Sequence, residues 1–275
     1  MNTTGIKWTE KTWNPVTGCT PVSEGCRHCY AKRIAEDPTK AALFPNGFGM
    51  SLRPKRLDQP KYLPEPTLVF VNSMSDLFWD KVPVDFVDKV MDVIESLPQH
   101  RFQVLTKRPE RMAAYSLRRP LPCNVWAGTS IESQKVAGRF DDLLKVQGAG
   151  VKFISAEPLL GPLVLEWKAV DWVIVGGESG SHLNDVETCE DRGLVVEALG
   201  RWFPREDRKD WVRSIRDGCT KAGTAFFFKQ WGGPWSNSGG SWLDGKKWEQ
   251  YPADMPCWPV KSAVVTAATD ELPLF

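Results

Sequence analysis

Leu68-Val69-Phe70-Val71-Asn72-Ser73-Met74-Ser75-Asp76 is the stretch of sequence that decides the fold. Its first four residues are all apolar, and a mostly polar cluster follows them directly. An apolar run without alternation indicates a strand buried on both faces, as in a parallel sheet. The same pattern recurs downstream at residues 102–105, 125–127, 151–154, 173–175 and 225–228. Stretches with apolar residues at helical spacing occur between the runs, at residues 84–97, 133–146 and 210–222.

Strands that alternate with helices predict an α/β fold built from right-handed βαβ units. We predict a partial or complete (β/α)6–8 parallel barrel over residues 1–235, in preference to a doubly wound open sheet. Residues 181–210 are rich in charged side chains and lengthen one interval between strands, so we expect them to be an insertion. Residues 236–275 carry a glycine pair and several prolines, which predict an irregular C-terminal extension packed on the barrel.

The composition is that of an ordinary globular protein with two basic stretches, one of which, residues 99–120, holds six Lys or Arg against one Asp or Glu. Of the 275 residues, 42% are hydrophobic and 25% are charged, and the formal net charge is +1. Residues 27–61 hold eight Lys or Arg against three Asp or Glu, which indicates either a solvated face or a footprint for phosphates or nucleic acid. Neither a leader nor an apolar run of membrane-spanning length is evident, so we expect a cytoplasmic protein with no membrane partner.

Polar side chains follow every predicted strand. The carboxyl ends of parallel strands form the ligand site in α/β folds, so these residues are candidates for function. Carboxylates crowded at one edge need cationic partners. The three that close successive strands are Glu132, Glu157 and Glu178, and suitable cations are Lys107, Arg108 and Lys229. The alternative is that these charged residues form only structural ion pairs and take no part in a reaction. In an active site we expect catalytic roles for Lys107, Glu157 and Glu178, and substrate contacts from Arg108, Lys229 and Gln230.

Three cysteines lie close together near the N-terminus, where Cys19, Cys26 and Cys29 form a Cys-x6-Cys-x2-Cys pattern. Clustered thiols in a reducing compartment predict a metal centre rather than disulfides. Three ligands without an obvious fourth leave one coordination position open, as catalytic sites require. One possibility is a zinc ion whose fourth ligand is water, because His28 lies between two of the cysteines in sequence and is poorly placed to bind the same ion. The other is a 4Fe–4S cluster with one open iron. Soft thiolate ligands favour the cluster.

The cysteine pattern at the start of an α/β barrel resembles the radical S-adenosylmethionine superfamily. More narrowly, residues 6–235 resemble an uncharacterised family known from phage genes and associated with three-Cys-motif partner proteins. The strings that carry this resemblance are Trp-Asn-Pro-Val-Thr-Gly-Cys, His-Cys-Tyr-Ala, Ser-Met-Ser-Asp-Leu-Phe, Leu-Thr-Lys-Arg-Pro, Ser-Ala-Glu-Pro-Leu-Leu-Gly, Gly-Gly-Glu-Ser-Gly and Phe-Lys-Gln-Trp-Gly.

The resemblance implies a 4Fe–4S cluster on the three cysteines, S-adenosylmethionine as cosubstrate, and an electron donor. It also implies cofactor contacts from His28, Asn72, Ser73, Asp76, Thr129, Ser130 and Glu132. Two features depart from the superfamily. The first cysteine gap is six residues instead of three, and Gly176-Gly177-Glu178 comes too late in the chain to take the usual methionine-binding role.

Two functions follow from these observations. The first is a radical S-adenosylmethionine enzyme whose substrate is a nucleic acid or a nucleotide, with a three-Cys-motif protein as a partner. The alternative is a non-enzymatic nucleic-acid-binding module that zinc or a closed cluster stabilises, in which Lys, Arg and Trp contact phosphates and bases. The series of polar strand ends favours the enzyme, because a binding module has no need of converging carboxylates.

Overall fold

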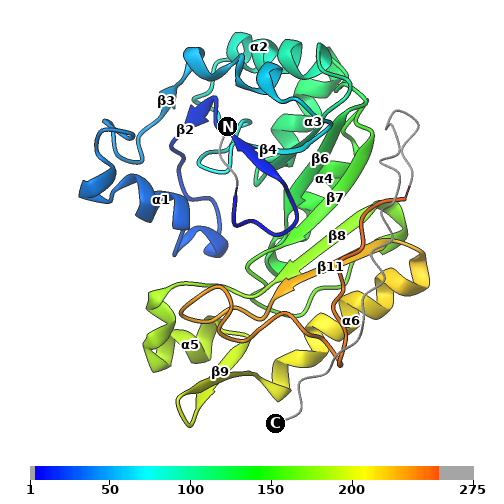
Figure 1. The fold of residues 1–275 in the computed structure, drawn as a ribbon. Helices are drawn as coiled ribbons and strands as arrows, with labels where there is room; N and C mark the ends of the chain where they lie inside the picture. Colours follow the sequence, from blue (N-terminus) through cyan, green and yellow to red (C-terminus); the bar gives the residue numbers. More distant parts are fainter. Residues whose placement is uncertain (1–3, 254–275) are drawn as a thin grey trace.

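The computed structural model describes residues 4–253, and its centre is a seven-stranded parallel sheet. The strands in spatial order are β1 (Lys11–Trp13), β4 (Leu68–Val71), β5 (Arg101–Thr106), β6 (Val125–Ser130), β7 (Val151–Ala156), β8 (Trp172–Gly176) and β11 (Ala225–Gln230). Spatial order follows chain order, so every crossover moves in the same direction. Within the described residues β1 and β11 remain at opposite edges, and the sheet is a curled half-barrel (Figure 1). This confirms the predicted partial barrel.

The crossovers between strands are mostly helical. The helices that connect β4 to β7 and precede β11 are α2 (Val84–Glu95), α3 (Pro109–Arg118), α4 (Arg139–Leu144) and α6 (Glu206–Ala222). The predicted helix over 133–146 is interrupted. A 3-10 turn, η5 (Gln134–Val136), precedes α4, and the two are separated by Ala137 and by Gly138, whose helix propensity is low. Helix α6 begins four residues before the predicted start at residue 210, with two acidic residues in its first turn, where they complement the helix dipole.

Both faces of the sheet are buried, which explains the unbroken apolar runs. Alternate side chains on each strand point to opposite faces. Those on the convex face pack against the helices. The concave face holds an aromatic cluster that includes Phe70, Trp126, Phe153 and Trp172. Trp8, from the segment before β1, lies in this cluster with its ring centroid 4.7 Å from that of Phe70. The N-terminal segment therefore fills part of the half-barrel interior.

Two excursions from the sheet surround the carboxyl edge. The first, between β1 and β4, contains β2 (Val16–Thr17), η1 (Glu24–Cys26), α1 (Tyr30–Ala35), η2 (Pro38–Lys40), β3 (Ser51–Leu52), η3 (Pro54–Arg56) and η4 (Gln59–Tyr62). The second, between β8 and α6, contains η7 (Ser181–Asn184), α5 (Val186–Arg192) and the hairpin β9 (Val195–Ala198) and β10 (Arg201–Pro204). The two lie on either side of the strand ends (Figure 1). A single turn, η6 (Trp167–Ala169), precedes β8.

The C-terminal stretch returns across the sheet edge. Glu249 forms an antiparallel bridge with Phe227 of β11, and the Phe228 amide donates to the Trp248 carbonyl at 2.7 Å. Residues 236–253 hold no helix or named strand, and residues 254–275 of the predicted irregular extension lie outside the described residues. In the described part of the chain, no helix has the length and apolar character needed to cross a bilayer.

Candidate metal centre and active site

The cysteine loop, defined here as residues 18–29, lies along the carboxyl edge of the half-barrel. It leaves the sheet at Gly18, which forms a parallel bridge with Ser75 just after β4. Gly18 has a φ of 90°, and a methyl group there would collide with the Gly49 carbonyl, so only glycine fits. The loop then passes between α1 and the ends of the central strands (Figure 1). The fold thus brings the predicted metal ligands to the predicted ligand-binding edge.

Arg108, directly after β5, joins the first cysteine to the sheet. Its Nη1 lies 3.0 Å from Asp76 Oδ2 and 3.6 Å from Cys19 Sγ, and its Nη2 donates to the Thr20 carbonyl at 3.1 Å. Asp76 also accepts from the Thr106 hydroxyl at 2.7 Å. Arg108 and Asp76 are both less than 10% exposed. Arg108, predicted to contact substrate, therefore lies beneath the cysteine loop.

Glu132, at the end of β6, holds the middle of the loop. Its carboxylate accepts from the Ser23 hydroxyl at 2.7 Å and pairs with Lys107 Nζ at 3.2 Å and Arg139 Nη1 at 2.9 Å. Burial opposes ionisation of Glu132, but the two cations outweigh it and hold the pKa of its carboxyl below the ordinary value. A methyl group on Gly25 would collide with this carboxylate, so the loop approaches it as closely as glycine permits.

Residues of the second excursion, between β8 and α6, contact the C-terminal half of the cysteine loop. Arg192 of α5 donates to Glu178 Oε1 at 2.9 Å and to the Glu24 carbonyl at 3.0 Å. The rings of His28 and His182 stack with centroids 3.9 Å apart and planes 4° from parallel. Burial lowers the pKa of both imidazoles, although Glu178 opposes this. Arg192, which the sequence did not single out, is thus the ion-pair partner of Glu178.

Glu157, after β7, forms the remaining ion pair. Lys229 Nζ lies 2.9 Å from its Oε1, and the indole nitrogen of Trp8 donates to its Oε2 at 3.1 Å. Gln230 is buried and donates to the Ser179 hydroxyl at 2.7 Å. Of the three predicted cation–carboxylate partnerships, Lys107 and Lys229 do pair with strand-end glutamates, whereas Arg108 pairs with Asp76.

The other predicted cofactor residues lie at the same edge and are largely engaged by the protein. Asn72 has a φ of 59°, and its side-chain oxygen accepts from the Val16 amide at 3.2 Å, while its Nδ2 is buried without a partner among the described residues. The side-chain Nδ2 of Asn14 donates to the Ser73 hydroxyl at 3.1 Å. Thr129 donates to the Thr106 carbonyl at 2.8 Å, and Ser130 is buried.

The three loop cysteines are free and half-exposed. Burial, Asp76 and the neighbouring Cys26 raise the pKa of the Cys19 thiol to about 11, although Arg108 opposes the shift. As the side chains stand, no three His, Cys, Asp or Glu among residues 4–253 converge as a metal-binding group. The cluster thus stays a prediction. Three thiols at the carboxyl edge of the sheet suit a 4Fe–4S cluster in their number, softness and position. His28 lies between two of these cysteines in sequence, and its buried Nε2 has no hydrogen-bond partner among the described residues.

Several residues that shape the site carried no sequence signal that we recognised. Asn14 accepts from the Met74 amide at 2.9 Å and thereby joins β1 to the residues after β4. The loop is also held by residues distant from it in sequence. Ser23 of the loop donates to Glu132, which Arg139 also contacts. His182 stacks on His28, and Arg192 donates to the Glu24 carbonyl. Asn14 lies within the Trp-Asn-Pro string of the resemblance, which is the one signal that could have found it.

Comparison with known proteins identifies the family. The chain belongs to the family described as "Protein of unknown function (DUF5131)", whose model matches residues 3–192 and 203–252. The residues between these two matches, 193–202, contain most of the β9–β10 hairpin. No curated protein matches the chain.

Solved structures of spore photoproduct lyase have some similarity to the chain. The enzyme complexed with dinucleoside spore photoproduct has a TM-score of 0.45 and 13% identity, covering 83% of this chain and 79% of that chain. A point mutant has a TM-score of 0.47 and 12% identity over 81% and 78%. A double mutant with bound AdoMet and dinucleoside spore photoproduct has a TM-score of 0.45 and 14% identity over 82% and 76%.

Proposed function

We propose that this protein is a radical S-adenosylmethionine enzyme with a 4Fe–4S cluster on Cys19, Cys26 and Cys29. The observation that carries the proposal is the anchoring of the cysteine loop to the ends of four of the seven strands. Gly18 bridges to the end of β4, and the side chains that follow β5, β6 and β8 reach the loop directly or through Arg192. A loop that only needed metal for its own folding would not require this attachment to the edge where α/β enzymes bind substrates.

The charged residues under the loop position it and its surroundings. Arg108 fixes Cys19 against the sheet, Glu132 fixes Ser23, and Arg192 fixes Glu24. Cys19, Cys26 and Cys29 would hold the cluster, which would supply the one-electron reduction that cleaves S-adenosylmethionine and so allows hydrogen abstraction from the substrate, with the electron coming from an external donor.

The predicted catalytic residues have assigned places in this proposal. Lys107, Glu157 and Glu178 stand at three strand ends, each in an ion pair with a partly or fully buried partner. We assign them to holding charge in fixed positions around the bound cosubstrate. His28 presents an unpartnered ring nitrogen beside the cysteines and is the residue we assign to the adenine.

Anaerobic purification tests the proposal. The wild-type chain is expected to contain about four iron atoms, to be brown, and to form 5′-deoxyadenosine when S-adenosylmethionine and dithionite are added. Cys26→Ser should abolish iron binding and 5′-deoxyadenosine formation, whereas Cys219→Ser, which alters a buried cysteine of α6 far from the loop in sequence, should retain both. A colourless protein with one zinc would overturn the proposal in favour of a metal-stabilised binding module. An iron protein that never cleaves the cosubstrate would also overturn it.

A further inference from the structure

The segment Arg27–Lys61 is strongly basic. It carries a net charge of +5, while the rest of the protein carries −4. We call this segment the basic lobe; Figure 1 shows it around α1 and β3, beside the cysteine loop and apart from the sheet. A positive lobe on an otherwise slightly acidic protein attracts polyanions to one place. That place adjoins the predicted metal ligands, because the lobe begins two residues before Cys29.

Most Lys and Arg side chains of the basic lobe form no ion pair with another described residue. Its paired acids, Glu36 and Asp58, have Lys32 and Lys61 as partners in exposed pairs of nearby residues. Such surface pairs contribute little energy and exchange readily with a ligand. No carboxylate within the described chain lies within 4.0 Å of the other six cations, which are Arg27, Arg33, Lys40, Arg53, Lys55 and Arg56. Four of those six are exposed.

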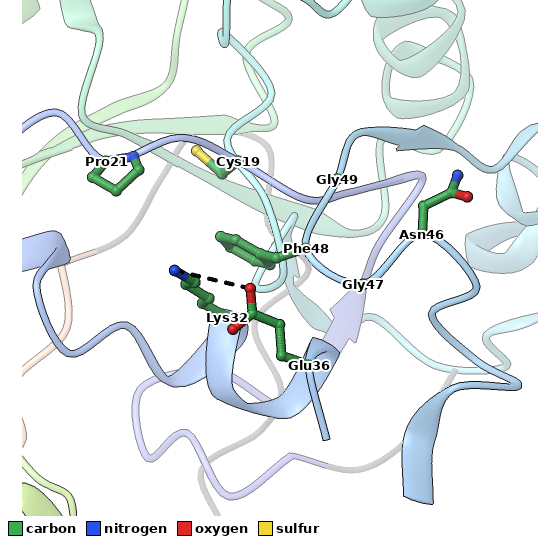
Figure 2. A pocket seen from close by; sticks show the side chains of 8 residues that line it. All are labelled: Cys19, Pro21, Lys32, Glu36, Asn46, Gly47, Phe48 and Gly49. Carbon is green, nitrogen blue, oxygen red and sulfur yellow. Dashed lines mark ion pairs between the residues drawn. The ribbon is translucent and has the colours of Figure 1, made fainter. Parts of the chain in front are cut away.

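A pocket of about 360 Å³ opens where the lobe meets the cysteine loop. Figure 2 shows the Phe48 ring between Cys19 and the ends of Lys32 and Glu36. Phe48 packs against the apolar residues of α1 and also lines the pocket, so its position is fixed. Lys32 Nζ and Glu36 Oε1 lie 3.9 Å apart, with both side chains about half exposed. An aromatic ring, a cation and a carboxylate thus line one small pocket next to a predicted cluster ligand.

We infer that the basic lobe binds the phosphates of a single-stranded nucleic acid and that the Phe48 pocket receives one of its bases. The lobe supplies the charge that tracks a sugar–phosphate backbone, and Phe48 supplies the stacking surface. Glu36 accepts from the exocyclic amine of a base, and Lys32 binds phosphate. An acidic peptide would use the cations but would leave the aromatic pocket without a role. The inference names the substrate class of the proposed enzyme and rests on the proposed function for the chemistry, but not for the binding.

Binding to the metal-free full-length chain tests the inference independently of any cluster. Fluorescence anisotropy of a labelled 20-nucleotide single strand, at 50 to 300 mM KCl, should give a dissociation constant that rises steeply with salt. Lys40→Glu/Lys55→Glu should weaken binding about tenfold or more at 50 mM salt and flatten the log–log slope by about 1.4, because each phosphate contact to a single strand contributes about 0.7. Lys168→Glu/Lys221→Glu is the matched control. It changes the net charge equally, but its exposed lysines precede β8 and β11, at the opposite edge of the sheet.

Phe48→Leu tests the base pocket, because leucine keeps the apolar packing and removes the stacking face. It should weaken oligonucleotide binding at least about fivefold and leave the affinity for polyphosphate, which has no bases, unchanged. Lack of saturable binding at 50 mM salt would overturn the inference, as would equal losses in the two charge-reversed doubles. Polyphosphate or an acidic peptide binding as tightly as the oligonucleotide would also overturn it. A chain that binds the strand but holds no iron would refute the proposed function alone.

Discussion

Glu132→Gln is the substitution that most directly tests how the cysteine loop is held. Glu132 is 2% exposed and lies among a hydroxyl of the loop and two cations of the scaffold. Glutamine has nearly the same shape but no charge. It therefore leaves the packing intact while removing the counter-charge of Lys107, which is 19% exposed, and of Arg139, which is 11% exposed.

The magnitude follows from the burial of the three groups. Removing one partner of a buried ion pair costs about 3 to 5 kcal/mol, because the other charge stays desolvated. Lys107 and Arg139 retain some access to water, and Arg139 keeps its hydrogen bond to the Ser130 carbonyl at 2.9 Å. We therefore expect the lower end of that range, a loss of about 3 kcal/mol in the free energy of unfolding at neutral pH.

The pH dependence has a defined sign. The pKa of Glu132 is lowered in the folded chain, so its stabilising effect is present above the ordinary pKa of glutamate and is lost as the pH falls through the lowered value. Glutamine does not titrate. The difference in stability between the wild type and Glu132→Gln should therefore shrink as the solution becomes acidic.

Urea unfolding of the metal-free chain, followed by tryptophan fluorescence at pH 7.5 and pH 3.5, measures both effects. Glu166→Gln is the control, because Glu166 is exposed before η6 and its substitution should change stability by no more than about 0.5 kcal/mol. A Glu132→Gln loss within 1 kcal/mol of this control at pH 7.5 would refute the reasoning. A difference from the wild type that grows at pH 3.5 would refute the assigned sign.

Three further outcomes test the fold around the site. Gly177→Ala should lower the free energy of unfolding by about 3 kcal/mol, because its methyl group would collide with the Trp231 carbonyl, whereas Gly138→Ala, with open space, should be nearly neutral; equal urea midpoints would contradict this. Trp8→Ala should cost about 3 kcal/mol if the N-terminal segment fills the half-barrel, and an unchanged thermal midpoint would argue against that role. The Cys219 thiol, whose pKa burial raises to about 12, should resist iodoacetamide at pH 8 until urea is added, as peptide mass mapping would reveal.

The strand-end pattern predicted most of the sheet and the edge where the candidate site lies. Apolar runs buried on both faces gave six strands, and parallel order follows because each run is separated from the next by a crossover of helical length. The short strand β1 is only three residues long, too few to set a period, and it is not among the six apolar runs. The break between η5 and α4 was missed because a single glycine in an otherwise amphipathic stretch is a weak signal.

The partners of the strand-end charges could not be predicted in full. Lys107, Arg108 and Lys229 were expected to balance the three glutamates; Lys107 and Lys229 do so, whereas Arg108 pairs with Asp76. Arg192 reaches Glu178 from a helix of the second excursion, and Arg139 reaches Glu132 from α4. Neither arginine ends a strand, so the rule that located the site had no means of selecting them.

Local chemistry and periodicity depend on neighbouring residues, so the sequence by itself determined the parallel α/β sheet, its carboxyl edge and the three clustered cysteines that are the candidate metal ligands. Only the tertiary structure decided which charges meet there, because ion pairs such as that of Arg192 with Glu178 depend on how whole excursions pack over the strand ends. It also decided that Phe48, Lys32 and Glu36 share one pocket with Cys19. Contacts of that kind arise from the sum of many packing interactions, and no short window of sequence contains them.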